Sequence, residues 1–516
     1  MLLVAVMLIA ALGPAAATAA PSNVSPDATP ISSCTTIESS GEYVLSSDVS
    51  DAPETGCLVV TADDVTVDGN GYAITSSEDA ARGPAILATD AENVSVKNAS
   101  LSGWQVGVAF DGVDRGSVTN VRVTTAAIVG ITIEGSSQDI AVADNGVRDG
   151  TDGVRLAAAS DVAVRDNAFS GLTGTAVDLR ANASDATVQN NTVSDTSGIG
   201  VRVTGAQNVS VVGNDITNAA DAGIGVDEAA VVAIEENRLE AISGVGIRVR
   251  SSPGTQTRNN VVTDARSGGI RYVESGDAVP SVEFVVVDRP AVAGILGFQG
   301  GFANEISRPF VIGQRSKDAT HESVVANNTV KRSYNHGVIV QSTEEIVVSD
   351  NRVEQSDDGI HVTDSTDVTV RRNELRQNFD DGVAFERVSD SKIDANNATN
   401  NGDNGIYVVG NRNLLVENTG LSNGDDGIDL QNTSRSAVRS NVLTENADDG
   451  LFLRNANNGS IIGNTIRSNV DDGIHLRQSD GNVIRDNAVC RNGDEAIVEV
   501  ASQNNDVTPG DCEPDD

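Results

Sequence analysis

The sequence has few positive charges and few aromatic residues, and each shortage excludes a class of protein. Lys and Arg number 35 against 74 Asp and Glu, giving a formal net charge of −39. That charge excludes a nucleic-acid binder that neutralises phosphates, and it disfavours docking on anionic lipid. Aromatic residues make up only 3% of the 516 residues, but hydrophobic residues reach 39%, which is too many for a disordered acidic tail. Together with 50 glycines, this composition predicts many short β-strands joined by small turns.

Lysine is especially scarce. Only four lysines occur, at Lys97, Lys317, Lys331 and Lys392. An acidic, arginine-over-lysine surface keeps a protein soluble in concentrated salt, where charges are screened within about 3 Å at 1 M. We therefore expect the protein of an extreme halophile.

A long apolar run occurs only at the start of the chain. Residues 1–20 are apolar and contain Ala17-Thr18-Ala19, which fits the cleavage pattern of a signal peptide, although the usual positive start is missing. A buried or membrane-anchoring helix is the alternative. No later stretch approaches the roughly 20 apolar residues of a transmembrane helix. The sequence thus predicts a secreted or cell-surface protein without a transmembrane segment.

Two columns of residues recur together, in most coils every 22 or 23 residues, and in one coil Ala176-Val177 takes the place of the glycine. One is a glycine followed by Ile, Val or Leu, at Gly107, Gly130, Gly153, Gly200, Gly223, Gly246, Gly269, Gly337, Gly359, Gly382, Gly405, Gly427, Gly450 and Gly473. The other is an asparagine, at Asn145, Asn167, Asn191, Asn214, Asn237, Asn260, Asn328, Asn351, Asn373, Asn418, Asn441, Asn464 and Asn487. Such internal repetition indicates stacked structural units.

The segments between these columns alternate with period two, which indicates strands and not helices. We predict an all-β fold, a right-handed parallel β-helix of about 18 coils of 22–24 residues, with the asparagines stacked at an inward turn. The expected divisions are a signal peptide (1–20), an N-terminal linker and cap (21–60), coils (61–275), a degenerate or inserted part (276–325), coils (326–500), and a C-terminal cap with an acidic tail (501–516).

The cysteines fit the same period. Cys34 and Cys57 are 23 residues apart, and Cys490 and Cys512 are 22 apart, so each pair falls on adjacent coils at one angular position. Stacked coils bring such Cα atoms to about 5 Å, within disulfide range. We predict two disulfides, with free buried thiols as the alternative.

The period falters between about residues 276 and 325. Either degenerate coils continue there, or the chain makes a lateral excursion from the rod. Since Gly269 and Gly337 are separated by close to three coil lengths, we favour degenerate coils that carry one long loop.

The first coils, with Cys34-Thr-Thr-Ile, Gly41-Glu-Tyr-Val-Leu and Val65-Thr-Val-Asp-Gly-Asn-Gly, resemble NosD-type and related archaeal surface β-helix proteins. The remaining coils resemble the repeat of pectate lyases and polygalacturonases. The resemblance implies the fold, but it identifies no reaction, because sites are grafted onto folds.

Two activities suggested by these families fit the residues poorly. Copper sites use Met, Cys or clustered His, and here the cysteines pair and the histidines (His321, His336, His361, His475) are dispersed, so copper is unlikely as a cofactor. Polygalacturonase-type hydrolysis is disfavoured because the expected His-Gly and Arg-x-Lys motifs do not follow the paired aspartates.

An Asp-Asp-Gly motif recurs in the C-terminal half. These aspartates are weak candidates for binding Ca²⁺, one pair per coil, whereas ordinary turn chemistry before a glycine is the favoured interpretation. The residues are Asp357, Asp358, Asp380, Asp381, Asp425, Asp426, Asp448, Asp449, Asp471 and Asp472.

The strand after each glycine predicts the candidate binding face, because alternate residues point outward. Outward positions carry Arg155, Arg180, Arg202, Arg248, Arg250 and Arg271, and then His361, Tyr407, Asp429, Phe452, Arg454, His475 and Arg477. Guanidinium groups suit the carboxylate or sulfate groups of a polymer. The alternative is that these arginines pair with neighbouring aspartates such as Asp178 and Asp227.

We expect a secreted or cell-surface protein that binds an acidic polysaccharide or glycoconjugate as an envelope or adhesion component. The predicted substrate-binding residues are the six arginines with His361, Tyr407, Asp429 and His475. A polysaccharide lyase or epimerase that uses Arg202, Arg248 or Arg271 as the base is the alternative, and a passive structural rod is the third possibility.

Overall fold

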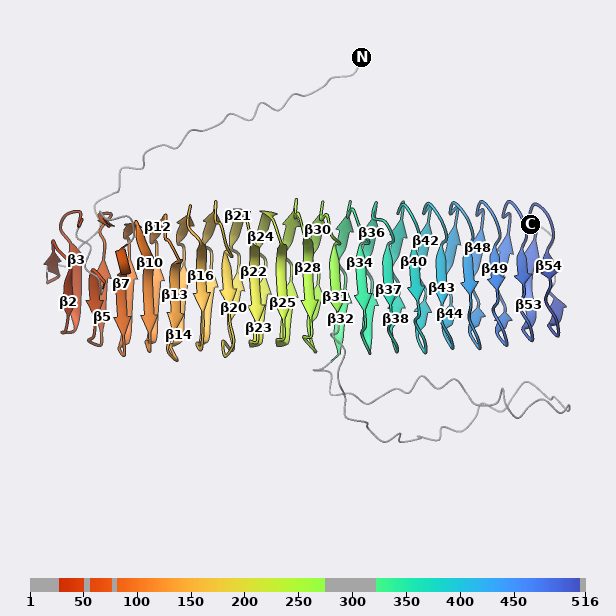
Figure 1. Cartoon of the computed structure of the whole chain (residues 1–516), viewed down its shortest axis with the longest axis horizontal. Helices are drawn as coiled ribbons and strands as arrows, with labels where there is room; N and C mark the ends of the chain where they lie inside the picture. The colour runs from red at the N-terminus through yellow and green to blue at the C-terminus, as the bar shows by residue number, and fades with distance from the viewer. Residues whose placement is uncertain (1–26, 51–55, 77–80, 274–321, 511–516) are drawn as a thin grey trace, which may run out of the picture.

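The structure is a computed structural model that describes residues 27–50, 56–76, 81–273 and 322–510. The described chain forms one long rod in which successive coils lie side by side from the N-terminal to the C-terminal end (Figure 1). The described residues form strands and no helix, so none of them forms a helix that could cross a membrane. The prediction of an all-β, right-handed parallel β-helix of about 18 coils is confirmed.

Each coil contributes one strand to each of up to three parallel sheets, which we name A, B and C. Sheet B follows the glycine column. Its strands are β2 (Thr35–Ile37), β4 (Leu58–Val60), β7 (Ala81–Thr89), β10 (Trp104–Asp111), β13 (Val129–Glu134), β16 (Asp152–Leu156), β19 (Val177–Leu179), β22 (Ile199–Thr204), β25 (Ala222–Asp227), β28 (Val245–Arg250), β31 (Ile270–Val273), β34 (Val338–Gln341), β37 (Ile360–Thr363), β40 (Val383–Glu386), β43 (Ile406–Val409), β46 (Ile428–Gln431), β49 (Leu451–Arg454), β52 (Ile474–Arg477) and β54 (Ile497–Val500).

Sheet A precedes the asparagine column. Its strands are β1 (Thr29–Ile31), β3 (Gly41–Leu45), β5 (Val65–Asp68), β8 (Glu92–Lys97), β11 (Asp114–Thr119), β14 (Gln138–Ala143), β17 (Ser160–Arg165), β20 (Thr187–Gln189), β23 (Gln207–Val212), β26 (Ala230–Glu235), β29 (Gln256–Arg258), β32 (Ser323–Ala326), β35 (Ile346–Ser349), β38 (Thr369–Arg371), β41 (Lys392–Asp394), β44 (Leu414–Val416), β47 (Ala437–Arg439), β50 (Ser460–Ile462), β53 (Val483–Cys490) and β55 (Asp506–Pro509).

Sheet C follows the asparagine column. Its strands are β6 (Ala73–Thr75), β9 (Ser100–Ser102), β12 (Arg122–Thr124), β15 (Gly146–Arg148), β18 (Ala168–Ser170), β21 (Thr192–Thr196), β24 (Asp215–Ala219), β27 (Arg238–Glu240), β30 (Val261–Thr263), β33 (Thr329–Lys331), β36 (Arg352–Glu354), β39 (Glu374–Arg376), β42 (Asn397–Thr399), β45 (Thr419–Leu421), β48 (Val442–Thr444) and β51 (Thr465–Arg467).

The core is a column of branched aliphatic side chains inside the coil. Val201, Ile224 and Ile247 are register partners in successive strands of sheet B, and all three are fully buried. In each of these strands, the residue next to the buried one points outward, as alternation requires. Burial of the aliphatic column therefore fixes which side chains of sheet B face the outside.

The predicted asparagine column forms a continuous hydrogen-bonded ladder at the turn between sheets A and C. Asn191 is typical: its backbone N–H and its Nδ2 both donate to Oδ1 of Asn214, at 2.9 and 3.0 Å. Its Nδ2 also donates to the Val164 carbonyl oxygen at 2.9 Å. The sequence analysis did not include Asn396, which occupies the place in the ladder between Asn373 and Asn418. The ladder satisfies buried polar groups at every turn.

A second asparagine ladder, which the sequence analysis missed, runs through the C-terminal half at the turn between sheets C and B. Each Nδ2 donates to Oδ1 of the next member at about 3 Å, as in the first ladder. Its members are Asn378, Asn401, Asn423, Asn446, Asn469 and Asn492.

The glycine column is explained by the closeness of adjacent coils. A Cβ atom added to Gly200 would lie 2.6 Å from the carbonyl oxygen of Gly223 and 2.7 Å from Cγ2 of Ile216. Neither neighbour can move without disturbing the stack, because one is backbone and the other is a core side chain. Glycine is thus favoured where the chain enters sheet B, although Ala176 occupies the equivalent place before β19.

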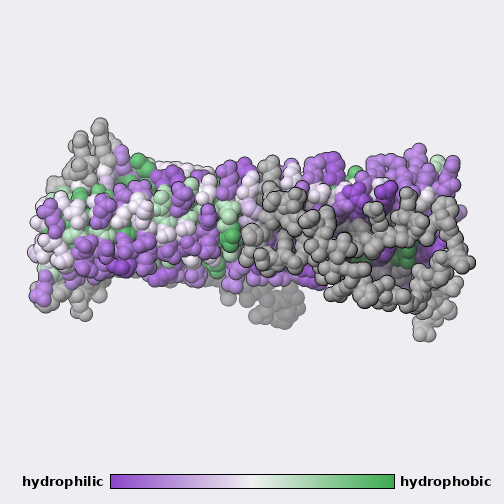
Figure 2. Space-filling view, turned by 90° about the horizontal axis from the view of Figure 1, so that it is seen from below, coloured by the Kyte–Doolittle hydropathy of each residue, from purple (hydrophilic) through white to green (hydrophobic). Residues whose placement is uncertain are grey.

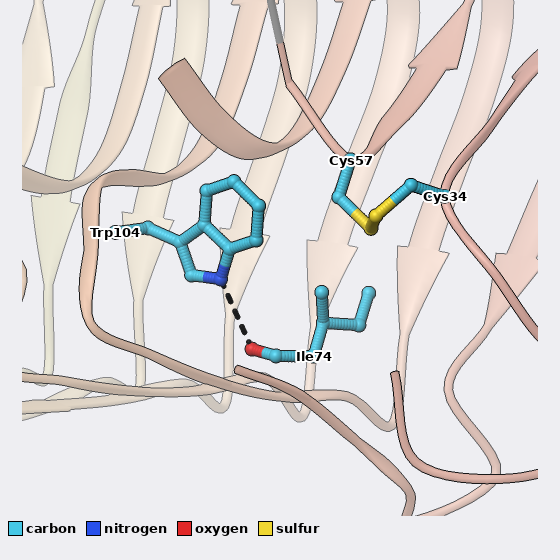
Figure 3. Close-up of a disulfide and its surroundings, with 4 residues drawn as sticks. All are labelled: Cys34, Cys57, Ile74 and Trp104. Carbon is cyan, nitrogen blue, oxygen red and sulfur yellow. Dashed lines mark hydrogen bonds between the residues drawn. A yellow bond between two sulfur atoms is a disulfide. The ribbon is translucent and has the colours of Figure 1, made fainter. Parts of the chain in front are cut away.

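The first predicted disulfide is confirmed. Cys34 and Cys57 are bonded, with their Cα atoms 4.4 Å apart on adjacent coils (Figure 3). Beside them the indole Nε1 of buried Trp104 donates to the Ile74 carbonyl oxygen at 3.1 Å. The bond between Cys490 and Cys512 stays a prediction, because Cys512 lies outside the described residues.

The stack continues directly across the part where the period falters. β31 pairs with β34, so that Ile270 lies beside Val338, and Nδ2 of Asn260 donates to Oδ1 of Asn328 at 3.0 Å. No coil stands between these two, so the expectation that degenerate coils continue the stack here is wrong. Residues 274–321 themselves lie outside the described residues, as do the predicted signal peptide and the end of the acidic tail.

Candidate functional site

The outward-facing side chains of sheet B form one straight row along the rod, which we name the central row. The register of neighbouring strands places its members directly beside one another, one per coil. They are Arg155, Asp178, Arg202, Gly225, Arg248, Arg271, Ile339, His361, Ala384, Tyr407, Asp429, Phe452 and His475.

The structure thus brings eight of the ten predicted substrate-binding residues into one row. The other two lie beside it. Arg250 occupies the neighbouring outward position of β28, and Arg180 directly follows β19. Whether these residues bind a substrate stays a prediction.

Several of the arginines form ion pairs with aspartates, as the alternative interpretation expects. Arg180 Nε lies 2.8 Å from Asp178 Oδ2, and Arg250 lies 2.9 Å from Asp227 Oδ1. Arg155 reaches Asp152 at 2.6 Å in the same way. These three guanidinium groups are largely committed to their aspartates.

The other three arginines are less committed. Arg248 lies 3.2 Å from Asp221 and 3.8 Å from Asp227, whereas Arg271 donates to the Gln341 side chain at 3.0 Å. Among the described residues Arg202 has no ion pair within 4 Å. Guanidinium donors therefore remain available in the coils of β22, β28 and β31.

Buried polar atoms without a hydrogen-bond partner gather on the central row. Within the described part of the chain, six such side-chain atoms belong to this row. They are Nε of Arg155, Arg248 and Arg271, Oδ1 of Asp178 and Asp429, and Nε2 of His475. Most buried polar groups in proteins are paired, so a cluster of exceptions needs an explanation.

The second aspartate of each Asp-Asp-Gly motif has a structural role. Oδ1 of Asp426 accepts the backbone N–H of Asp449 at 2.9 Å, and Oδ1 of Asp449 accepts that of Asp472 at the same distance. Asp358 and Asp381 make equivalent bonds to the next coil. These carboxylates form a third inter-coil ladder, and Oδ2 of Asp358 and of Asp449 faces His361 and His475 of the central row.

Burial and mutual repulsion perturb these carboxyl groups. Burial, followed by the charge of Asp358, raises the pKa of Asp381 to about 8. Burial, followed by repulsion from Asp429 and Asp449, raises the pKa of Asp426 to about 9. Burial is also the main reason that the pKa of Asp449 rises to about 7 and that of Asp429 to about 6. Near neutral pH the carboxyl groups of Asp381 and Asp426 therefore hold protons, whereas Asp429 is mostly ionised.

The ten predicted Ca²⁺-binding aspartates form two adjacent columns, in which the first member of each pair is more exposed. Carboxylate oxygens of Asp425, Asp426 and Asp448 lie within 4.8 Å of one another. The hydrogen bonds of the second members agree with a role in the turn. Calcium binding stays a prediction.

Two histidines that sequence reasoning treated as dispersed are in contact. The rings of His336 and His361 stack, with centroids 4.1 Å apart and planes inclined by 14°. Both Nδ1 atoms approach Oδ2 of buried Asp358, at 2.8 and 2.7 Å. Burial alone would raise the pKa of Asp358, but the two histidines outweigh burial and hold that pKa low. The premise of dispersed histidines therefore fails for this pair.

Aromatic side chains also line the face. Phe452 meets His475 edge to face at 5.0 Å, and the guanidinium of Arg454 lies 5.8 Å from the centre of the Phe452 ring. Tyr334 and Phe379, which the sequence analysis did not select, stand 78% and 73% exposed in the turns before sheet B. A hydrophilic surface surrounds small hydrophobic patches on the face shown in Figure 2.

Comparisons with known proteins agree with the fold. The family profile described as right handed beta helix region matches residues 33–193, 129–285, 315–447 and 415–509. Among solved structures, the chain is similar to the mannuronan C-5 epimerase A-module of Azotobacter vinelandii, with 12% identity, coverage of 80% of this chain and 91% of that chain, and a TM-score of 0.33. It is also similar to the catalytic domain of an alpha-1,3-glucanase, with 8% identity, coverage of 70% and 60%, and a TM-score of 0.38.

A third similar structure is the DFA-IIIase of Arthrobacter chlorophenolicus A6, with 12% identity, coverage of 57% and 72%, and a TM-score of 0.35. A comparison with curated protein sequences finds no match. The family profile supports the fold, whereas no argument is drawn from solved structures at these TM-scores, and the NosD-type resemblance stays a prediction.

Proposed function

We propose, since this chain belongs to the right-handed beta helix family, that it binds an acidic polysaccharide along the central row of sheet B. The observation that carries the proposal is the concentration of unpartnered buried polar atoms on that row. A buried donor or acceptor without a partner costs about 1–3 kcal/mol, so turning these side chains toward the hydroxyl and carboxylate groups of a polymer would be favourable.

The arginines of the row give the proposal its preference for acidic sugars. Arg202, Arg248 and Arg271 share one row in β22, β28 and β31, and the guanidinium of Arg248 spans the space left by Gly225. A guanidinium group donates bidentately to carboxylate or sulfate. The available arginines thus form a short cationic stretch within an otherwise acidic protein.

The C-terminal half of the face suits the rest of the sugar. Exposed Tyr334 and Phe379 offer flat apolar surfaces beside carboxyl groups that can accept or donate hydrogen bonds. Aromatic faces combined with directed polar groups are the usual means of binding a ring that has one apolar and one polar side. The row is straight and has one member per coil, which favours a linear polymer over a small molecule.

Binding can be tested by affinity chromatography and calorimetry on alginate and on a sulfated glycan in high salt. Arg202→Glu combined with Arg271→Glu should abolish retention. Arg122→Glu combined with Arg439→Glu makes the same charge change on exposed side chains of sheets C and A and should leave retention intact. Equal loss in both pairs, or no retention of the unaltered protein, would reject the proposal.

The cellular setting is part of the proposal. A net charge of −39, the scarcity of lysine and a disulfide support an exported protein of a salt-rich environment, acting at the envelope or in adhesion. Growth of the native organism in salt, followed by detection of the protein in the medium and wall fractions, tests this setting.

A second candidate function is a lyase or epimerase, which one pair of residues favours. Asp426 and Asp429 lie three residues apart with pKa values of about 9 and about 6, so that near neutral pH one holds a proton and the other does not. Such separated pairs are typical of acid–base catalysis. The arginine-based version has less support, since Ile199, Val245 and Gly268, not aspartates, precede the glycines in the coils of Arg202, Arg248 and Arg271.

Incubation with uronate polymers separates this candidate from binding alone. Unsaturated products absorb in the ultraviolet, and epimerisation changes the proton NMR spectrum of the polymer. Neither signal would appear if the protein only binds. Turnover that Asp429→Asn leaves unchanged would place the reaction elsewhere.

A further inference from the structure

We infer that His336, His361 and Asp358 form a binding site for one divalent transition-metal ion, for which Zn²⁺ is the probe. The site lies on the same face as the central row, where β34 and β37 adjoin. It requires no glycan, so the inference goes beyond the proposed function and can be tested separately from it.

The three side chains come from two adjacent coils. Asp358 lies one coil of 22 residues beyond His336, and His361 follows Asp358 by three residues on the same coil. His361 points outward from β37, whereas His336 and Asp358 each precede the glycine that begins the strand. Stacking of the coils therefore places two mutually stacked imidazoles beside one carboxylate oxygen.

The spacing of the ligand atoms suits a metal ion. Nδ1 of His336 and Nδ1 of His361 lie 2.8 and 2.7 Å from the same oxygen, Oδ2 of Asp358, and all three atoms lie within 4.8 Å of one another. Zn–N and Zn–O bonds of about 2.0–2.1 Å place ligands about 2.9–3.3 Å apart at ordinary bond angles. The two N–O distances of 2.7 and 2.8 Å lie just below that range, so binding requires the side chains to move slightly apart.

The hydrogen bonds around His336 give an independent reason for a cation. Nδ1 of His336 accepts the backbone N–H of Asp358 at 3.3 Å, while the same atom faces the Asp358 carboxylate at 2.8 Å. One nitrogen cannot accept the first hydrogen and donate to the second oxygen in the same state. A cation bound through the Nδ1 lone pair would replace the 3.3 Å hydrogen bond and make the approach of Nδ1 to Oδ2 favourable without a proton on Nδ1.

Burial and a second hydrogen bond orient the Asp358 carboxylate toward the histidines. Asp358 is 3% exposed, and its Oδ1 accepts the backbone N–H of Asp381 at 3.0 Å, which leaves Oδ2 directed at the histidines. Such a second hydrogen bond orients a ligating carboxylate. Asp357, whose Oδ2 lies 3.9 Å from Nδ1 of His336, stands on the exposed side as a further oxygen ligand.

The donor set selects the class of ion. Two imidazoles with one carboxylate favour Zn²⁺ and the neighbouring late transition metals over Ca²⁺ or Mg²⁺, which take oxygen ligands. The other described histidine, His475, has a single imidazole near Asp449 and Asp472, at 3.2 and 3.5 Å. His475 therefore serves as the matched control.

The test is calorimetric titration of the full-length, tag-free protein with Zn²⁺ after chelator treatment. Molar NaCl and excess Mg²⁺ suppress loose binding to the acidic surface. We expect one saturable site per chain, weakened at least tenfold by His361→Ala or His336→Ala and unchanged by His475→Ala. Circular dichroism confirms that each variant keeps its fold.

Cobalt gives a second readout that loose binding does not produce. Co²⁺ bound through imidazoles should show visible d–d absorption that is lost in the His336→Ala, His361→Ala double variant. No saturable binding, binding that both alanine variants retain, or weakening by His475→Ala to the same extent would each overturn the inference.

Discussion

Replacing Asp426 by Asn should stabilise the rod, and the gain should increase with pH. Asp426 is 3% exposed, and its Oδ1 accepts the N–H of Asp449 at 2.9 Å, a bond that an asparagine Oδ1 would keep. The same column already contains an amide: Asn404 accepts the N–H of Asp426 through its Oδ1 at 3.2 Å. The substitution thus removes a titratable group while retaining the inter-coil ladder.

The magnitude follows from the difference in proton affinity between the folded and unfolded states. Burial and the charges of Asp429 and Asp449 raise the pKa of Asp426 to about 9, against about 3.9 in an unfolded chain. Between these values the folded state holds a proton that the unfolded state releases, so stability falls as pH rises. At about 1.36 kcal/mol per pH unit, the isolated group costs about 4 kcal/mol at pH 7. Because neighbouring carboxyl groups share this titration, we expect about 2 kcal/mol.

Denaturant unfolding, followed by circular dichroism from about pH 5 to about pH 8 at constant salt with a chelator present, measures the effect. Asp139→Asn, an exposed change on sheet A, is the control and should alter the free energy of unfolding by less than about 0.5 kcal/mol. If Asp426→Asn were neutral or destabilising at the upper end of this range, or if its effect did not depend on pH, the raised pKa would be refuted.

Three further predictions concern the stack itself. Asn214→Ala removes four buried hydrogen bonds and should lower the free energy of unfolding by about 3 kcal/mol, whereas Asn397→Ala, an exposed change on sheet C, should cost less than about 0.5 kcal/mol in the same denaturant assay. Gly200→Ala places a Cβ 2.6 Å from a carbonyl oxygen of the next coil and should cost about 2 kcal/mol; a neutral result would mean that the coils can separate locally. Replacing Cys34 and Cys57 by Ser should lower stability by about 3 kcal/mol in thermal melting and reduce the effect of a reductant to that of the predicted Cys490–Cys512 bond, and an unchanged melt would contradict the stabilising role of the Cys34–Cys57 bond.

Most of the fold could be predicted from the repeat period. Since adjacent coils differ by 22 or 23 residues, the period alone places Cys34 beside Cys57 and Asn191 beside Asn214, and the structure confirms both. Strand alternation likewise predicted which side chains of sheet B face outward. These inferences succeed because they depend on backbone register, which a periodic sequence fixes.

The site was less predictable because side-chain contacts depend on more than register. Alternation directed Arg180 and Arg250 outward but could not show that their guanidinium groups turn toward aspartates. His336 and His361 occupy different columns, so a comparison within columns kept them apart. The signal was nevertheless present, since His336 and Asp358 share a column and His361 follows Asp358 by three residues.

The direct pairing of β31 with β34 could not be deduced from length. The distance from Gly269 to Gly337 is close to a whole number of coils, which made continuation of the stack a reasonable expectation. Only the hydrogen bonds between Asn260 and Asn328 show that the two coils are neighbours.

The asparagine ladder gives the molecule a polarity. From Asn145 to Asn487 every link has the same sense, with Nδ2 donating toward the C-terminal end and Oδ1 facing the N-terminal end. Aligned amide dipoles in a buried chain of hydrogen bonds reinforce one another. The two ends of the rod are therefore electrically different, and a linear glycan, whose own ends also differ, would meet a surface on which the two possible directions of binding have unequal energies.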